Sequence, residues 1–351
     1  MKLFFLILVA TICSVPAITQ PTSTVAVLVK EGIELHDKGE YDAAIKKYDA
    51  ALLVDKDDYN ANYEKSLSCM YSKRYDDCIA ISKYLIEQHA DNPALPGVYA
   101  NYGSALDDKG EGEAAIKIFD EGIQKFPAAY LIQFNKGLTY GRLEKWDDAL
   151  NSFFSTMKIK PAHAGSLYYT SLSLDKSNKV AALISGLSFL AAEPEGKRAV
   201  TIYKHVNELI GSFVQKSKEG NNVISINVDA LDNKKKENNF GMVQMMLGLT
   251  AASSIADSVK ATTDVEKLSL YVQLLANALS TGKKDGKGIY WEVYALFWIE
   301  MKQKDLIPVY AHIASITSGN EENIKWINDN QNKLKAFYEW YNNYKWETTS
   351  N

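Results

Sequence analysis

Between residues 25 and 196, apolar side chains recur at intervals of three or four in short runs, and each run ends at a polar turn. This spacing places the apolar side chains on one face of a helix. The turns read DKGEY, SKRYD, DKGEG and RLEKW, and a second run of the same kind follows each of them. The pattern therefore predicts pairs of short amphipathic helices, closed by segments such as KDD, ADNP, FP or KP.

These helix pairs repeat along the chain. The position of Ala44 recurs at Cys78, Ala115, Ala149 and Leu183, in steps of 34, 37, 34 and 34 residues, and the longer step contains PALP at 93–96. A fixed period of this length is typical of stacked repeats. The predicted repeats are 25–58, 59–92, 96–129, 130–163 and 164–196.

Small and large residues alternate between the two helices of each pair. We expect the small residues of the first helix to let the second helix approach closely. Tyr48, Phe119 and Phe153 on the second helix are expected to fill the space between hairpins. Pro127 and Pro161 should end the second helix, because proline clashes with the preceding turn. The small residues are Gly32, Ser66, Gly103, Gly137 and Ser171.

Together these features resemble tetratricopeptide repeats over about residues 25–196. The resemblance implies an all-α fold, a right-handed superhelix of about five helical hairpins. It also implies that the first helices line a groove that binds a peptide or protein segment. By analogy with the family, the groove residues include Val29, Ile33, Tyr63, Met70, Tyr71, Phe134 and Tyr168.

The side chains at these groove positions are mostly apolar or aromatic. Val29 and Ile33 stand where one subclass of the family has the lysine and asparagine that clamp a terminal carboxylate. The groove is therefore expected to take apolar or aromatic side chains, with Tyr63, Met70, Tyr71, Phe134 and Tyr168 as anchors. The alternative is that these residues pack inside the superhelix or are covered by the C-terminal region.

From about Lys197 the 34-residue period stops, and 197–351 is predicted to be a Trp-rich helical domain. Its first helix is KRAVTIYKHVNELIGSFVQK, followed by a polar linker at about 217–238 in which NVISINVDAL predicts a short strand. The stripe of Tyr290, Tyr294, Phe297, Trp298 and Met301 is predicted to be core. Further helices are expected at 239–260, 264–281, 287–303, 305–317 and 320–345.

The N-terminus MKLFFLILVATICSVPA is typical of a signal peptide, residues 1–17, cleaved near Ala17. Its apolar run is too short to cross a bilayer, and no later segment reaches that length. The chain is thus expected to be exported, either to the bacterial periplasm or into the medium, without a membrane span.

The composition gives no sign of other chemistry. The net charge of −4 offers no basic surface for nucleic acid. Walker, HExxH and GxSxG motifs are missing, so we expect no catalysis, no cofactor and no metal site. Cys69 and Cys78 are expected to face each other across the second hairpin, either as a disulfide or as two packed thiols.

These observations favour a protein-interaction scaffold or adaptor whose partner is a protein or peptide. Two alternatives stay open. One is a small-ligand binder or enzyme that uses a pocket between the repeat array and the C-terminal helices. The other is a structural oligomer subunit.

Overall fold

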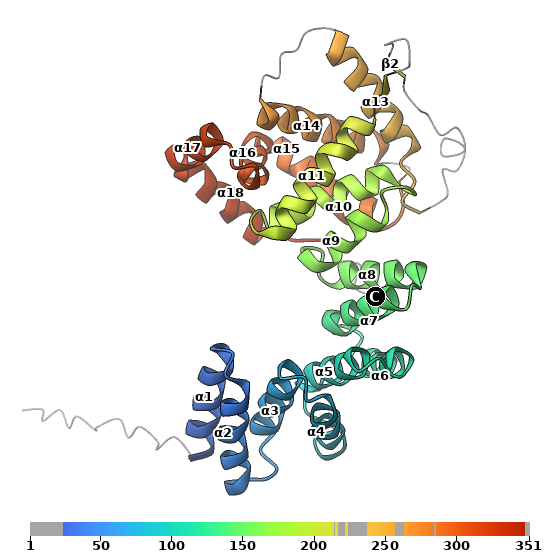
Figure 1. Cartoon of the computed structure of the whole chain (residues 1–351). Helices are drawn as coiled ribbons and strands as arrows, with labels where there is room; N and C mark the ends of the chain where they lie inside the picture. The colour runs from blue at the N-terminus through green and yellow to red at the C-terminus, as the bar shows by residue number, and fades with distance from the viewer. Residues whose placement is uncertain are drawn as a thin grey trace, which may run out of the picture. The chain divides into compact units, whose positions relative to one another are not determined.

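A computed structural model describes residues 24–213, 215–216, 222–223, 237–256, 263–283 and 286–347, and nearly all of them are helical (Figure 1). The predicted signal peptide and most of the predicted linker lie outside the described residues. The chain forms two compact units, which divide between Asp91 and Asn92. We call them the N-terminal unit and the C-terminal unit and describe each by itself.

The N-terminal unit holds the first two predicted hairpins. They are α1 (Thr24–Asp37) with α2 (Tyr41–Val54), and α3 (Tyr59–Tyr71) with α4 (Tyr75–Gln88). Buried apolar residues of α1, α2 and α3 form one core cluster, which contains Val25, Val29, Ala44, Tyr48, Ala51 and Ala61.

The C-terminal unit begins with the other three predicted hairpins. They are α5 (Leu95–Asp108) with α6 (Gly112–Lys125), α7 (Tyr130–Arg142) with α8 (Trp146–Ile159), and α9 (Ala164–Ser173) with α10 (Lys179–Ala192). The all-helical hairpin array expected from the sequence is thus confirmed.

A glycine in the first helix receives an aromatic ring from the second helix in three of the hairpins. A Cβ atom built on Gly32, Gly103 or Gly137 would lie 2.3, 2.2 or 2.6 Å from the ring of Tyr48, Phe119 or Phe153, respectively. All three rings are buried. Each ring therefore packs against the glycine of its own hairpin. The sequence analysis had expected these rings to fill the space between hairpins.

The turns of the first four hairpins share one backbone conformation. Gly39, Lys73, Gly110 and Glu144 all have positive φ, at 78°, 61°, 91° and 59°. Glycine adopts this region without steric cost, whereas lysine and glutamate do so under strain. The turn geometry is therefore set by the hairpin packing, because it persists where the local sequence disfavours it.

The core of the C-terminal unit is centred on α10. Nearly all residues of this helix are buried, including the whole run from Val180 to Leu190. Tyr310 Oη donates a hydrogen bond to the Leu187 carbonyl at 2.7 Å, and the hydroxyls of Ser185 and Tyr290 lie 2.5 Å apart. One hydrophobic cluster extends from Met157 to Phe337. This cluster contains residues on both sides of the domain boundary predicted at 196/197. That boundary stays a prediction.

The remaining elements follow the sequence expectation with two differences. The predicted strand is limited, within the described residues, to β2 (Asn222–Val223), which pairs antiparallel with β1 (Gln215–Lys216). The helix predicted at 320–345 is two helices, α17 (Glu321–Asp329) and α18 (Gln331–Asn343), broken at Asn330. The other elements are α11 (Lys197–Ser212), α13 (Gly241–Ala256), α14 (Asp264–Gly282), the π-helix η1 (Tyr290–Tyr294), α15 (Ala295–Gln303), α16 (Ile307–Ala314) and the 3-10 turn η2 (Ile316–Ser318).

Candidate partner-binding groove

A cavity of about 320 Å³ lies between the first helices of the N-terminal unit, and we call it the α1–α3 cavity. Val25, Val29 and Ile33 form its apolar wall on α1 at the spacing of one helix face. Asn60 and Glu64 enter it from α3 with the i, i+4 spacing that also shares a face. Ala26, Lys30 and Asp58 complete the lining.

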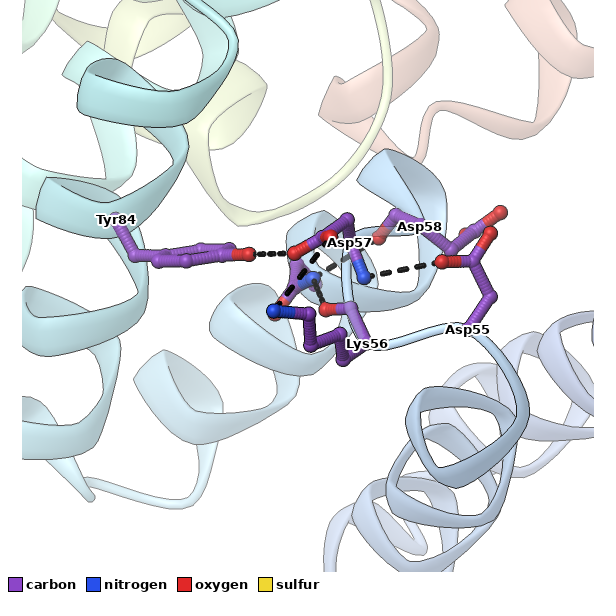
Figure 2. A network of polar contacts seen from close by, with 6 residues as sticks. Asp55, Lys56, Asp57, Asp58 and Tyr84 are labelled. Carbon is purple, nitrogen blue, oxygen red and sulfur yellow. Dashed lines mark hydrogen bonds and ion pairs between the residues drawn. The ribbon is translucent and has the colours of Figure 1, made fainter.

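The loop before α3 contains the lining residue Asp58 and is held by a network of polar contacts (Figure 2). Asp58 caps α3, because its carboxylate accepts a hydrogen bond of 2.7 Å from the Ala61 amide. Asp55 accepts a hydrogen bond from the Asp57 amide at 3.1 Å, and the Tyr84 hydroxyl donates to the Asp57 carboxylate. The acidic KDD segment therefore holds the start of α3 and links it to α4.

Glu64 and Lys30, two charged residues of the cavity lining, differ in burial. Burial raises the pKa of Glu64 above its usual value, and the nearby charge of Asp37 raises it further. Lys30 is exposed on the opposite wall. No ion pair joins Lys30 and Glu64 in the described structure, so a half-buried carboxyl group stands beside an apolar wall.

A second cavity, of about 500 Å³, lies at the same repeat position in the C-terminal unit, and we call it the α5–α7 cavity. Gly97 and Leu131 line it, and they occupy the repeat positions of Ala26 and Asn60, since the two intervening steps are 34 and 37 residues. Its surface is mostly apolar. The other lining residues are Pro96, Lys125, Phe126, Pro127, Ala128, Ala129, Tyr130 and Ile132.

Of the predicted groove residues of the N-terminal unit, the structure brings Val29 and Ile33 together in the α1–α3 cavity. Tyr63 is half-buried on α3 and stacks on Tyr59 at 6.2 Å. Met70 is also half-buried. Tyr71 is 58% exposed and stacks on Tyr41 at 5.5 Å, with His36 edge-on at 5.2 Å. None of these three lines a cavity described here.

In the C-terminal unit, the two predicted anchors pack against the array itself. Phe134 is half-buried, and its ring meets His163 edge-on at 4.6 Å. Tyr168 lies against Phe189 at 5.7 Å, and the guanidinium of Arg198 stands 5.8 Å from the centre of its ring. Tyr168 is half-buried, and Arg198, which lies beyond the predicted repeats, is near its ring.

Polar residues at groove positions join neighbouring first helices. His36 Nδ1 lies 2.7 Å from Ser68 Oγ, between α1 and α3. Between α5 and α7, the buried carboxylate of Asp107 accepts hydrogen bonds from Thr139, at 2.7 Å, and from Arg142. These contacts align successive hairpins.

The sequence analysis missed Val25, Ala26, Lys30, Asp58 and Glu64 of the α1–α3 cavity, as well as the lining of the α5–α7 cavity. Glu64 is the most informative of them, because charge is rarely placed beside apolar surface without a partner. The signal in the sequence was its i, i+4 spacing from Asn60, which puts both residues on one helix face.

Cys69 and Cys78 are packed thiols in the structure. Both are completely buried, and no disulfide joins them, so the bridged alternative is not realised. Burial raises the pKa of Cys69 to about 11 and that of Cys78 to about 12. A thiol with such a pKa is unreactive at neutral pH, because the thiolate is the nucleophile.

A third cavity lies entirely within the C-terminal unit, with a volume of about 570 Å³, and we call it the α14–α17 cavity. His312 and Trp326 stack face to face in its wall, with ring centres 3.5 Å apart. His312 Nδ1 lies 2.6 Å from Asn323 Oδ1, and the Tyr203 hydroxyl is buried without a hydrogen-bond partner among the described residues. The lining also carries Asp264, Glu266 and Glu322.

The described ranges show neither a metal-binding cluster nor a membrane-spanning helix. Their His, Cys, Asp and Glu side chains do not gather in groups of three that could hold a metal ion. Of the helices that the structure describes, none is both long enough and apolar enough to cross a bilayer.

No protein-family model and no curated protein matches the chain. Several solved structures resemble it over about half its length. A thermophilic tetratricopeptide protein of Thermus thermophilus is 18% identical, with 53% of this chain and 98% of that chain covered and a TM-score of 0.43. PilF of Pseudomonas aeruginosa is 15% identical, with 54% and 90% covered and a TM-score of 0.45. YrrB, described as a tetratricopeptide protein with an unusual peptide-binding site, is 18% identical, with 50% and 90% covered and a TM-score of 0.37.

Hairpins that repeat every 34 residues, with an aromatic ring seated on a small residue, have the tetratricopeptide architecture. The described helices from Thr24 to Ala192 form five helical hairpins at steps of 34 or 37 residues, and three of them carry the aromatic ring on a glycine.

Proposed function

We propose that the chain is a protein-interaction scaffold whose first helices bind a peptide or protein segment of a partner. The observation that carries this proposal is the recurrence of a cavity at one repeat position in both units. The α1–α3 and α5–α7 cavities are each lined by the equivalent groove positions, Ala26 with Asn60 and Gly97 with Leu131. Repeat proteins bind through surfaces built from equivalent positions of successive repeats.

The binding residues that we propose overlap in part with those predicted, because Ile33 was predicted and Leu131 was not. Ile33 and Leu131 line the cavities, and truncating them should cost little stability because Ile33 is half-buried and Leu131 is 47% exposed. We further propose that the partner is an envelope protein or peptide, since residues 1–17 have the pattern of a signal peptide.

A capture experiment with matched variants tests this function. The full chain would be immobilised and exposed to an envelope extract, beside Ile33→Ala/Leu131→Ala and the control Leu53→Ala, and bound proteins would be identified by mass spectrometry. Leu53 is 89% exposed and lines neither cavity. We expect a partner that wild type and the control retain and the cavity variant loses. Identical sets on all three baits would refute groove binding.

A second candidate function, small-ligand binding, is favoured by the α14–α17 cavity. Its lining combines the His312–Trp326 stack with three acidic residues and contains no lysine or arginine, although Lys333 Nζ, outside the lining, stands 5.5 Å from the centre of the Trp326 ring. Such a lining suits an aromatic cation rather than an anion. Calorimetric titration with tryptamine and with benzoate, on wild type and Glu322→Gln, would test this function. Saturable heat with tryptamine that the variant weakens would support it, and no heat with either probe would exclude both ligand types.

A further inference from the structure

Glu64 differs from the other carboxylates of the N-terminal unit that face a neighbouring helix. Glu31 is paired with Lys47 and Asp49 with Lys65, each at 2.6 Å. Glu64 forms no ion pair among the described residues. It is nevertheless half-buried in the α1–α3 cavity, beside the apolar wall of Val25, Val29 and Ile33.

The surrounding charges do not balance this carboxylate. Asp37 raises the pKa of Glu64, after the larger effect of burial, so its field is repulsive. Asp58 adds a second negative charge to the lining, although its carboxylate also caps α3. On α3 itself, the neighbouring Lys65 is engaged with Asp49. The exposed Lys30 is the one cation of the lining, and it does not reach Glu64.

A partner that covers the cavity would remove the remaining water from Glu64. Burying a carboxylate without a cation is costly, whereas an ammonium or guanidinium group within hydrogen-bond distance offsets much of that cost. The apolar wall next to it offers contact area to an apolar side chain. The cavity thus presents one apolar and one anionic subsite side by side.

We propose that the α1–α3 cavity recognises a basic apolar segment of a partner protein. In this arrangement an apolar side chain of the segment packs on Val25, Val29 and Ile33, and an adjacent lysine or arginine pairs with Glu64. The inference rests on the proposed groove function and names the class of segment that the N-terminal unit selects.

Fluorescence anisotropy with short labelled peptides that alternate leucine with lysine, glutamine or glutamate tests the selection, using the full chain. We expect the lysine peptide to bind about tenfold more tightly than the glutamine peptide, as for a charge-assisted hydrogen bond, and the glutamate peptide to bind least. Glu64→Gln should abolish the preference for lysine over glutamine.

The control is Glu40→Gln, which changes the net charge equally. Glu40 is exposed and does not line the cavity. It precedes α2, and its side chain makes no capping hydrogen bond to that helix. Thermal unfolding separates binding from folding, because removing a half-buried unpaired charge should leave the midpoint of Glu64→Gln unchanged or higher.

Three outcomes would overturn the inference. They are an equal loss of lysine preference in Glu40→Gln, a preference that survives in Glu64→Gln, and no binding of any peptide. The envelope capture could still succeed in each case, so the failure of this inference is distinguishable from failure of the groove function. Self-association that the lysine peptide does not disrupt would assign the cavity to a second copy of this chain and would also overturn it.

Discussion

Replacing Gly137 by alanine would measure how tightly the two helices of the fourth hairpin are packed. The new Cβ atom would lie 2.6 Å from Cε1 and 2.8 Å from Cδ1 of Phe153. Carbon atoms pack at about 3.5–4.0 Å, so one partner must move by roughly 0.9 Å. The ring of Phe153 is buried, stacked on Tyr169 at 5.4 Å and 5.8 Å from Phe134, so it has little freedom to yield. Overpacking of this kind costs about 1–3 kcal/mol.

Gly141 is the matched control, because it lies on the same helix. The nearest atom to a Cβ at this position is Cζ3 of Trp146, at an ordinary 3.8 Å. Both alanines gain helix propensity, at most about 1 kcal/mol each, and the comparison largely cancels this gain. We therefore expect Gly137→Ala to be about 1–3 kcal/mol less stable than Gly141→Ala.

Urea unfolding followed by far-UV circular dichroism would measure both free energies of unfolding. Phe153→Leu, alone and combined with Gly137→Ala, completes a double-mutant cycle that reports the coupling between the two sites. The smaller leucine should relieve part of the cost of the added methyl group. Equal stability of the two alanine variants, together with zero coupling, would show that the ring does not rest on the glycine.

Three further predictions concern single side chains. Glu144→Gly should raise the free energy of unfolding by about 1 kcal/mol in urea titrations, because Glu144 has φ of 59° where Gly39 and Gly110 stand in equivalent turns; a loss of stability would contradict this. Burial, followed by the charges of Lys160 and Arg198, lowers the pKa of His163 to about 4, from 6.5 in the unfolded chain. As the pH falls, the unfolded state therefore takes up this proton before the folded state does. The melting temperature should drop between pH 6.5 and 4, and it should drop less steeply in His163→Asn. Parallel curves of melting temperature against pH for wild type and variant would exclude this role. Cys69 and Cys78 should react with a thiol reagent only after denaturation, and rapid modification of the native chain would disprove their burial.

The hairpins could be predicted from the sequence because their determinants are local. Apolar spacing, the turn segments and the small-to-large pairing of Gly137 with Phe153 all lie within one repeat. The break at Asn330 was missed because this residue lies in a helical pattern. In the structure its φ is −117°, and its side-chain Nδ2 donates to the Trp326 carbonyl at 2.8 Å. Asparagine can satisfy the backbone in this way instead of continuing a helix.

The proposed binding residues could be predicted only in part, for a different reason. Val29 and Ile33 follow from repeat position alone, and they do line a cavity. Glu64 could not be predicted, because its lack of an ion pair depends on where the lysines of other helices lie in the folded structure. Tyr168 illustrates the opposite case, because Arg198, from the helix that follows the last hairpin, lies over the ring that the repeat position exposes.

The repeat array ends where a large side chain occupies the position that holds a small residue in the first helix of each hairpin. The small-residue position of Gly103, Gly137 and Ser171 recurs 34 residues later at His205 on α11. His205 Nε2 lies 3.2 Å from the Ser171 carbonyl, so α11 packs on the fifth hairpin as a next first helix would. An imidazole in this position leaves no room for the aromatic ring of a second helix. The apolar surface of α10 is then covered by the aromatic C-terminal helices, through Tyr290 and Tyr310, instead of by another repeat.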